Sequence, residues 1–237
     1  MFSETKSKES KVNEMEKLKT LFEVPKDNRS WDMSQTDELV KKRIDGGENI
    51  KDRGSSFKPM EFIYTRTWER IKEGKDFETN LKECNPNYKL GEKWNINCQR
   101  CVPTYEMRRR GYDVTANPKP ENVDETDLCY HPFDVWQNPD VIHCTGNGKK
   151  DIESKMKEWG DGARAQIVVS WKHTNSGHTF LAEQVDGKTI FIDPQTGSTD
   201  VSKYFKRVEK GSVQVCRIDN LDVTNKILDC SRRVSSC

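Results

Sequence analysis

The sequence lacks a long apolar run, a marked excess of one charge and an apolar N-terminal segment. No stretch approaches the ~20 apolar residues of a membrane-spanning helix, so we expect no membrane span. The formal net charge is only +1, so no overall field would recruit nucleic acid. The opening residues, MFSETKSKESKVNEM, carry no apolar core of a signal peptide, which predicts synthesis in the cytoplasm. Association with a virion, or delivery into a target cell by dedicated machinery, would leave no such mark.

Apolar residues are also scarce, at 32% of the 237 residues against 33% charged residues. This is polar for a single globule, so part of the chain should contribute little to a core. Residues 1–58 fit that description, because two short amphipathic helical patterns alternate there with polar, Gly- and Ser-containing stretches. We expect residues 1–58 to be a polar helical appendage that docks onto a particle, a capsid or an immunity protein. Residues 59–237 should form the folded domain.

Helical patterns precede strand patterns within residues 59–237. Helices are predicted over residues 59–73, 76–84, 102–110 and 151–159, with a helical turn near 227–228. Strands are predicted over residues 164–171, 178–185, 189–193 and 212–218. Residues 117–147 are rich in Pro, Asn and Asp and should form an irregular insertion. The sequence therefore predicts an α+β fold, with a helical half followed by an antiparallel meander.

Two cysteines lie at the start of the helix predicted to end at Gly111, in the segment NCQRCVPTYEMRRRG. Proline fits best in the first helical turn, so Pro103 predicts that the helix begins near Arg100 or Cys101. Free N–H groups at a helix start favour a thiolate, which makes Cys101 a candidate nucleophile. Cys98 lies one turn earlier and could reach the same place from the entering loop.

A histidine and an aspartate belong to the strands that follow. His178 opens one strand, and Asp193 closes the next, across an Asp-Gly turn typical of a β-hairpin. If that turn pairs Val185 with Lys188, His178 lies opposite Gln195 and close to Asp193. Thiolate, imidazole and carboxylate are the components of an acyl-transfer site, in which the carboxylate orients the imidazole.

Amide side chains near these groups could stabilise an oxyanion, and the candidates are Gln195, Gln99 and Asn97.

The eight cysteines allow a second hypothesis, a structural zinc module. Without a secretion signal we expect mostly reduced thiols rather than a disulfide framework. The zinc ligands would be Cys98, Cys101, Cys129 and His131, with His143 and Cys144 as further candidates.

Three motifs, NCQRCVPTYEMRRRGYDV, GHTFLAEQ and FIDPQTG, together resemble the papain-fold toxins described as glutamine deamidases among bacterial polymorphic toxins. Similar domains occur at the ends of phage head-associated proteins. The resemblance covers residues 85–207 and implies a papain-like cysteine-enzyme fold without a cofactor, with His178 as base and Asp193 as its orienter. Both cysteines match the family pattern. A papain-like C-x-x-C arrangement favours Cys101 by a small margin, whereas peptidases with the nucleophile thirteen residues before a helix-ending glycine favour Cys98.

The resemblance implies a thiol enzyme that attacks a carboxamide or peptide bond of a protein substrate in a target cell. Deamidation and proteolysis use the same groups, so both stay open, with a protein-glutamine deamidase toxin or effector preferred. The alternative from a different class is a phage structural or assembly protein that keeps an inactive papain fold.

Overall fold

The computed structural model describes residues 68–71 and 75–234. The appendage over residues 1–58, its boundary, and most of the helix expected over 59–73 lie outside the described residues and stay predictions. For residues 68–71, which are described, the prediction of a helix is wrong: these residues are not helical, and Arg70 forms a β-bridge with Tyr112.

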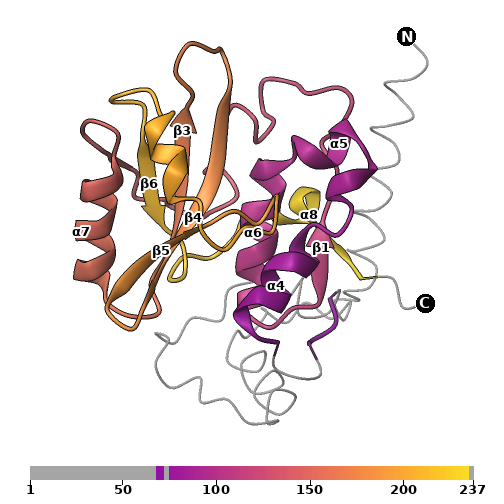
Figure 1. Cartoon of the computed structure of the whole chain (residues 1–237). Coiled ribbons are helices and arrows are strands. Elements are labelled where there is room, and N and C mark those ends of the chain that lie inside the picture. The colour runs from indigo at the N-terminus through magenta and orange to yellow at the C-terminus, as the bar shows by residue number, and fades with distance from the viewer. Residues whose placement is uncertain (1–67, 72–74, 235–237) are drawn as a thin grey trace, which may run out of the picture. The chain divides into compact units, whose positions relative to one another are not determined.

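Helices precede an antiparallel sheet in the chain, so the predicted α+β class is confirmed (Figure 1). The helical elements are α4 (Phe77–Cys84), η2 (Tyr88–Leu90), α5 (Glu92–Asn95), α6 (Cys98–Arg109), α7 (Lys149–Trp159), η3 (Ser202–Lys206) and α8 (Ile227–Cys230). The strands are β1 (Val114–Ala116), β2 (Ile142–His143), β3 (Arg164–Ser170), β4 (Gly177–Val185), β5 (Lys188–Ile192), β6 (Gln214–Arg217) and β7 (Ser231–Arg233).

The main sheet has the strand order β2-β6-β3-β4-β5, and all of its neighbouring strands are antiparallel. The expected meander is confirmed for β3, β4 and β5 but is wrong for β6, which lies on the other side of β3. The connection from β5 to β6 spans residues 193–213 and carries η3, so it is too long for a hairpin and instead crosses to the free edge of β3. A separate two-stranded sheet joins β1 to β7.

Helices α6 and α7 cover opposite faces of the main sheet (Figure 1). One apolar core joins α6 to Leu181 and Ile192, and the other joins α7 to Phe180 and Phe191. Neighbouring residues of a strand point to opposite faces, so β4 and β5 contribute to both cores. The sheet is therefore held between the central helix and α7.

Helix α6 is almost entirely buried, including its charged residues. Glu106 has no exposed surface, and its carboxylate receives hydrogen bonds from Arg110 at 2.8 Å and from Arg164 of β3 at 2.6 and 2.9 Å. Arg108 is also buried and pairs with Glu83 and Asp113. The arginines at this end of the helix therefore form ion pairs that tie it to its neighbours.

The start of α6 differs from the prediction. The helix begins at Cys98, three residues before Cys101, and Pro103 lies in its second turn. A proline there leaves the carbonyl oxygen of Gln99 without its usual helical donor. The thiol of Cys230 in α8 approaches that carbonyl at 4.0 Å, which partly compensates. The packing around α6 therefore accommodates a proline in the second turn. The helix can then extend back to Cys98, which is its first residue.

Residues 117–147 are mostly irregular, as expected, although they contain the short strand β2. The segment is not peripheral, because Trp136 is buried and its indole N–H donates to the Gln166 side chain of β3 at 2.6 Å. Among the helices of residues 68–71 and 75–234, none has the length and apolar character needed to span a bilayer.

Candidate active site

The hairpin of β4 and β5 joins a histidine to an aspartate. Its register pairs Val185 with Lys188 and Leu181 with Ile192, as the Asp-Gly turn predicts. His178 lies at the start of β4 and Asp193 directly follows β5. The His178 Nε2 atom lies 3.1 Å from Oδ2 of Asp193, and the carboxylate has no exposed surface. The hairpin therefore places an acid against the imidazole.

The Asp193 carboxylate is held by further donors. Its Oδ1 atom accepts the backbone N–H of Gln195 at 2.9 Å, and its Oδ2 atom accepts the hydroxyl of Tyr204 at 2.9 Å. Burial acts to raise the pKa of Asp193, but the bonds with His178, Tyr204 and the Gln195 N–H together hold it below its usual value. The carboxylate stays ionised and fixed in orientation.

Aromatic rings surround His178. Trp171 and Phe180 stack on the imidazole with centroid distances of 5.9 and 6.1 Å, and Tyr204 meets it edge to face at 5.7 Å. The sequence motifs did not indicate Tyr204, which lies in η3, eleven residues beyond Asp193. No local pattern marks this residue, because its role depends on the tertiary path of the connection after β5.

Cys98 is the thiol that the fold brings to His178. Burial acts to lower the pKa of His178, but side-chain hydrogen bonds with Asp193 and Cys98, and the charges of both groups, outweigh it and raise the pKa to about 10. Cys98 is the first residue of α6 and is 5% exposed. Its backbone N–H has no partner within the helix, as holds for the first residues of any α-helix. The site therefore combines a thiol, an imidazolium and free N–H groups.

Cys101 occupies a different environment. It has no exposed surface, and its thiol donates to Oδ1 of Asn97 at 3.3 Å. Burial, followed by the neighbouring thiol of Cys84, raises the pKa of Cys101 well above its ordinary value. Such surroundings favour a protonated, packed thiol over a nucleophile.

The three amide residues expected near an oxyanion are close to the thiols but differ in their contacts. The Asn97 side chain is buried and donates to the Asn117 carbonyl oxygen at 2.9 Å. The amide nitrogen of Gln195 reaches Oδ1 of Asn97 at 3.5 Å, which links the loop after β5 to the start of α6. Gln99 is the second residue of α6, and its side-chain oxygen is buried without a hydrogen-bond partner. The buried contacts of Asn97 and Gln195 hold the two halves of the site together.

The residues proposed as zinc ligands do not converge. Among the residues that the structure describes, no group of three or more His, Cys, Asp or Glu side chains is arranged to hold a metal ion. Cys129 lies beside Asp127, whereas His131 is exposed. The zinc hypothesis therefore lacks the ligand geometry that it requires.

A buried central helix that begins with a cysteine, packed on an antiparallel sheet that carries a His–Asp pair, defines a papain-like fold. Residues 96–198 match the family model described as papain fold toxin 1, glutamine deamidase. The matched segment contains Cys98, His178 and Asp193, so the resemblance indicated by the three motifs is confirmed over this part of the chain. A comparison with curated proteins found no match.

Proposed function

We propose that this protein is a thiol-dependent protein-glutamine deamidase that acts as a toxin in a target cell. The observation that carries the proposal is the contact of His178 with both Cys98 and the buried Asp193, within a segment that matches a glutamine deamidase family. In this proposal Cys98 is the nucleophile, His178 the general acid and base, and Asp193 the group that orients the imidazole.

The position of the helix start supports Cys98 in this proposal, rather than Cys101, which the sequence motifs slightly favoured. A helix start activates a thiol through its free N–H groups, and that argument applies to the residue at the first helical position. Because α6 begins at Cys98, the same physical reasoning now selects Cys98.

At neutral pH His178 would carry a proton, since its pKa is raised to about 10, and an adjacent imidazolium stabilises a thiolate nucleophile. The thiolate attacks the side-chain carbonyl carbon of a substrate glutamine. Free backbone N–H groups at the start of α6 would stabilise the oxyanion of the tetrahedral intermediate. His178 then donates its proton to the leaving nitrogen, so ammonia departs and a thioester remains.

Water completes the reaction. Neutral His178 removes a proton from water, which attacks the thioester carbonyl and displaces the Cys98 thiolate. The products are a glutamate side chain and ammonia, and the imidazolium is restored. Nε2 is bonded to Asp193, so Nδ1 is the nitrogen left to exchange protons at the reacting atoms.

The proposal is tested with purified wild-type protein, Cys98→Ala, Cys101→Ala and His178→Ala on proteins of a candidate target cell. We expect ammonia release and a mass gain of about one dalton at specific glutamines, since deamidation replaces NH with O. Cys98→Ala and His178→Ala should abolish both signals, whereas Cys101→Ala should retain them. New protein N-termini without ammonia would instead identify a peptidase.

Toxicity provides a second readout. Expression of the wild-type chain in a cytosol should arrest growth, and Cys98→Ala should relieve the arrest. Equal tolerance of both proteins, at equal expression, would contradict the assignment as a toxin.

A further inference from the structure

Five exposed or partly exposed cations lie on the two chain segments that carry Trp171 and Tyr204, the rings that contact His178, and we call them the basic margin: Lys172, Lys203, Lys206, Arg207 and Lys210. Within the part of the chain that the structure describes, none of the five forms an ion pair. This contrasts with the arginines of α6, which are buried against carboxylates. None of the five is therefore held against a carboxylate within ion-pair distance, although Lys203 is near enough to Asp200 to contribute to lowering the pKa of that carboxyl.

Backbone pairing and ring contacts fix the basic margin to the candidate site. Trp171 forms a β-bridge with Val208, and the backbone N–H of Lys172 donates to the Arg207 carbonyl oxygen at 2.9 Å. The Arg207 guanidinium carbon lies 4.9 Å from the centre of the Trp171 ring, which itself stacks on His178. The guanidinium is therefore one aromatic ring away from the imidazole.

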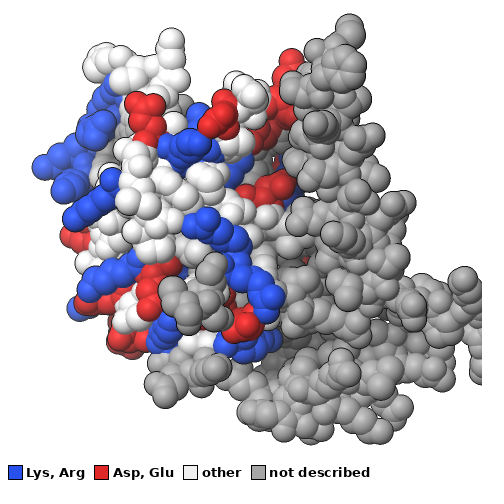
Figure 2. All heavy atoms as spheres, turned by 90° about the vertical axis from the view of Figure 1, so that its right-hand side faces the viewer, with Lys and Arg blue, Asp and Glu red and all other residues white. Residues whose placement is uncertain are grey.

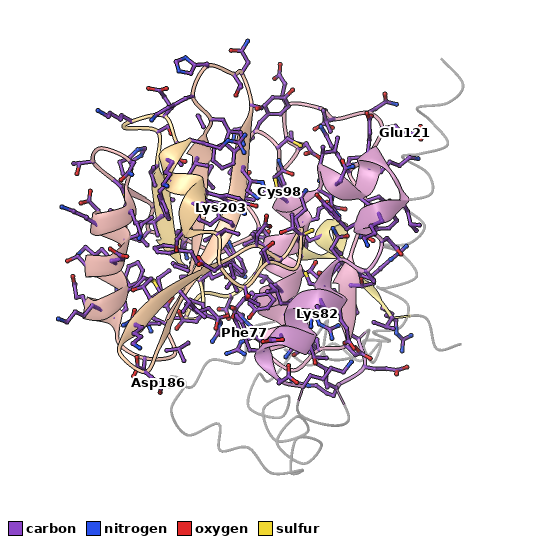
Figure 3. All side chains as sticks on the ribbon, viewed as in Figure 1. Phe77, Lys82, Cys98, Glu121, Asp186 and Lys203 are labelled. Atoms are coloured by element: carbon purple, nitrogen blue, oxygen red, sulfur yellow. The ribbon has the colours of Figure 1, made fainter. Side chains whose placement is uncertain are left out.

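Two lysines of the basic margin belong to η3, the helix that also supplies Tyr204 to the site. Lys203 precedes Tyr204 and Lys206 follows it by two residues; the Tyr204 ring contacts His178 at 5.7 Å and its hydroxyl donates to Asp193. Figure 3 shows Lys203 and Cys98 at a similar height near the middle of the view, above the hairpin turn at Asp186. Figure 2 shows Lys and Arg side chains gathered at the upper part of its left edge, which corresponds to the front of Figure 1.

The local charge is not a consequence of overall composition. Residues 200–210 carry four of these cations and two carboxylates, Asp200 and Glu209, which leaves an excess of two positive charges, and Lys172 adds a third. The whole chain carries a formal net charge of only +1. Protein charges that are opposite in sign to those of a substrate attract it to the site. They contribute more to the choice among substrates than to the affinity for any one of them.

We propose that the preferred substrate is a glutamine within an acidic protein segment, whose Asp and Glu residues are recognised by the basic margin. The inference rests on the proposed function, because it identifies the substrate class of the same site. The occupant is expected to be a peptide rather than nucleic acid, since the cations border a site whose groups act on carboxamides.

The experiment compares two synthetic peptides that carry one glutamine, flanked by glutamates in one and by lysines in the other. Wild-type protein should show a kcat/KM for ammonia release at least about tenfold higher for the glutamate-flanked peptide. The preference should fall as ionic strength rises from ~0.01 to ~0.15 M, because the Debye length shortens from ~30 to ~8 Å. Equal kcat/KM values for both peptides would overturn the inference.

Two double variants with the same change in net charge separate local from overall electrostatics. Lys203→Glu/Lys206→Glu should reduce or invert the preference. Lys157→Glu/Lys188→Glu, which reverses two exposed lysines on α7 and at the β4–β5 turn, should retain it. Equal loss in both variants would contradict a specific role of the basic margin.

Binding by the Cys98→Ala variant distinguishes the inference from the proposed function. Fluorescence anisotropy should show tighter binding of the glutamate-flanked peptide, lost when Lys203→Glu/Lys206→Glu is added. Such binding without ammonia release by wild-type protein would support the surface and contradict deamidation. If the lysine changes abolish binding of a single-stranded oligonucleotide but leave peptide binding unchanged, the margin serves nucleic acid and the inference is wrong.

Discussion

Replacement of Asp193 by Asn tests the electrostatic basis of the site. In the folded protein the pKa of His178 is raised from 6.5 to about 10. That difference of about 3.5 units corresponds to about 5 kcal/mol, at 1.36 kcal/mol per unit. Burial disfavours the charged imidazolium, and in Asp193→Asn the negative charge of Asp193 no longer offsets that cost. We expect the pKa of His178 in Asp193→Asn to fall by at least about two units.

The sign of the pH dependence follows from these shifts. The pKa of His178 is raised on folding, so its contribution is complete below pH 6.5 and is lost as pH rises through about 10. The pKa of Asp193 is lowered, so its contribution is present above pH 3.8 and is lost as pH falls through the folded value. Asp193→Asn should therefore cost about 3 kcal/mol at pH 6 and clearly less near pH 10.

Two measurements check this prediction. NMR titration of the histidine ring protons reports the pKa directly, and with four histidines the His178 signal is assignable by a His178→Gln variant. Urea unfolding at pH 6 and pH 10 gives the free energies. Asp186→Asn, at the exposed turn of the same hairpin, is the matched control and should change neither value. An unchanged pKa of His178 in Asp193→Asn, or an equal stability loss at both pH values, would refute the reasoning.

Three further substitutions test the supports of the site. Tyr204→Phe removes one hydrogen bond to the Asp193 carboxylate, so the pKa of Asp193 should rise and kcat/KM should fall about tenfold, with KM nearly unchanged. Gly177→Ala would place a Cβ atom 2.5 Å from a carbonyl oxygen of β3, and should lower the unfolding free energy by more than about 2 kcal/mol in urea titration. Glu106→Gln leaves Arg164 without its buried carboxylate, and should cost about 3 kcal/mol at pH 7. The Glu106 cost should shrink toward pH 2, because its pKa is lowered to about 2 and the wild-type carboxylate then protonates. An unchanged kcat/KM in Tyr204→Phe, or an unchanged free energy of unfolding in Gly177→Ala or Glu106→Gln, would contradict the corresponding contact.

The strand pairing that brings His178 close to Asp193 was predictable from the sequence, because it is determined by residues of the hairpin itself. The Asp-Gly turn fixes the pairing of Val185 with Lys188, and the period of two along each strand carries that register toward His178 and Asp193. The turn residues adopt the positive φ values, 49° and 73°, that this connection requires. Local turn chemistry therefore sufficed to place the acid near the imidazole.

Features that depend on tertiary packing were not predictable in this way. Pro103 indicated a later helix start, but α6 is stabilised by burial on several sides and accepts a proline in its second turn. The crossing of β6 to the edge of β3, and the contribution of Tyr204, depend on how the long connection after β5 packs. The error at Pro103 contributed to the preference for Cys101, beside the C-x-x-C arrangement, since the helix-start argument was applied to a later residue than the first residue of α6.

Mapping of the reactive thiol tests the central claim most directly. The full chain is exposed briefly to a small chloroacetamide at neutral pH, and the modified cysteine is identified by peptide mass spectrometry. We predict rapid modification of Cys98 ahead of the other seven cysteines, slowed at least about tenfold in His178→Ala, because the imidazolium stabilises the thiolate. Preferential modification of Cys101, or slow and uniform labelling that ignores His178→Ala, would contradict the assignment of Cys98 as the nucleophile.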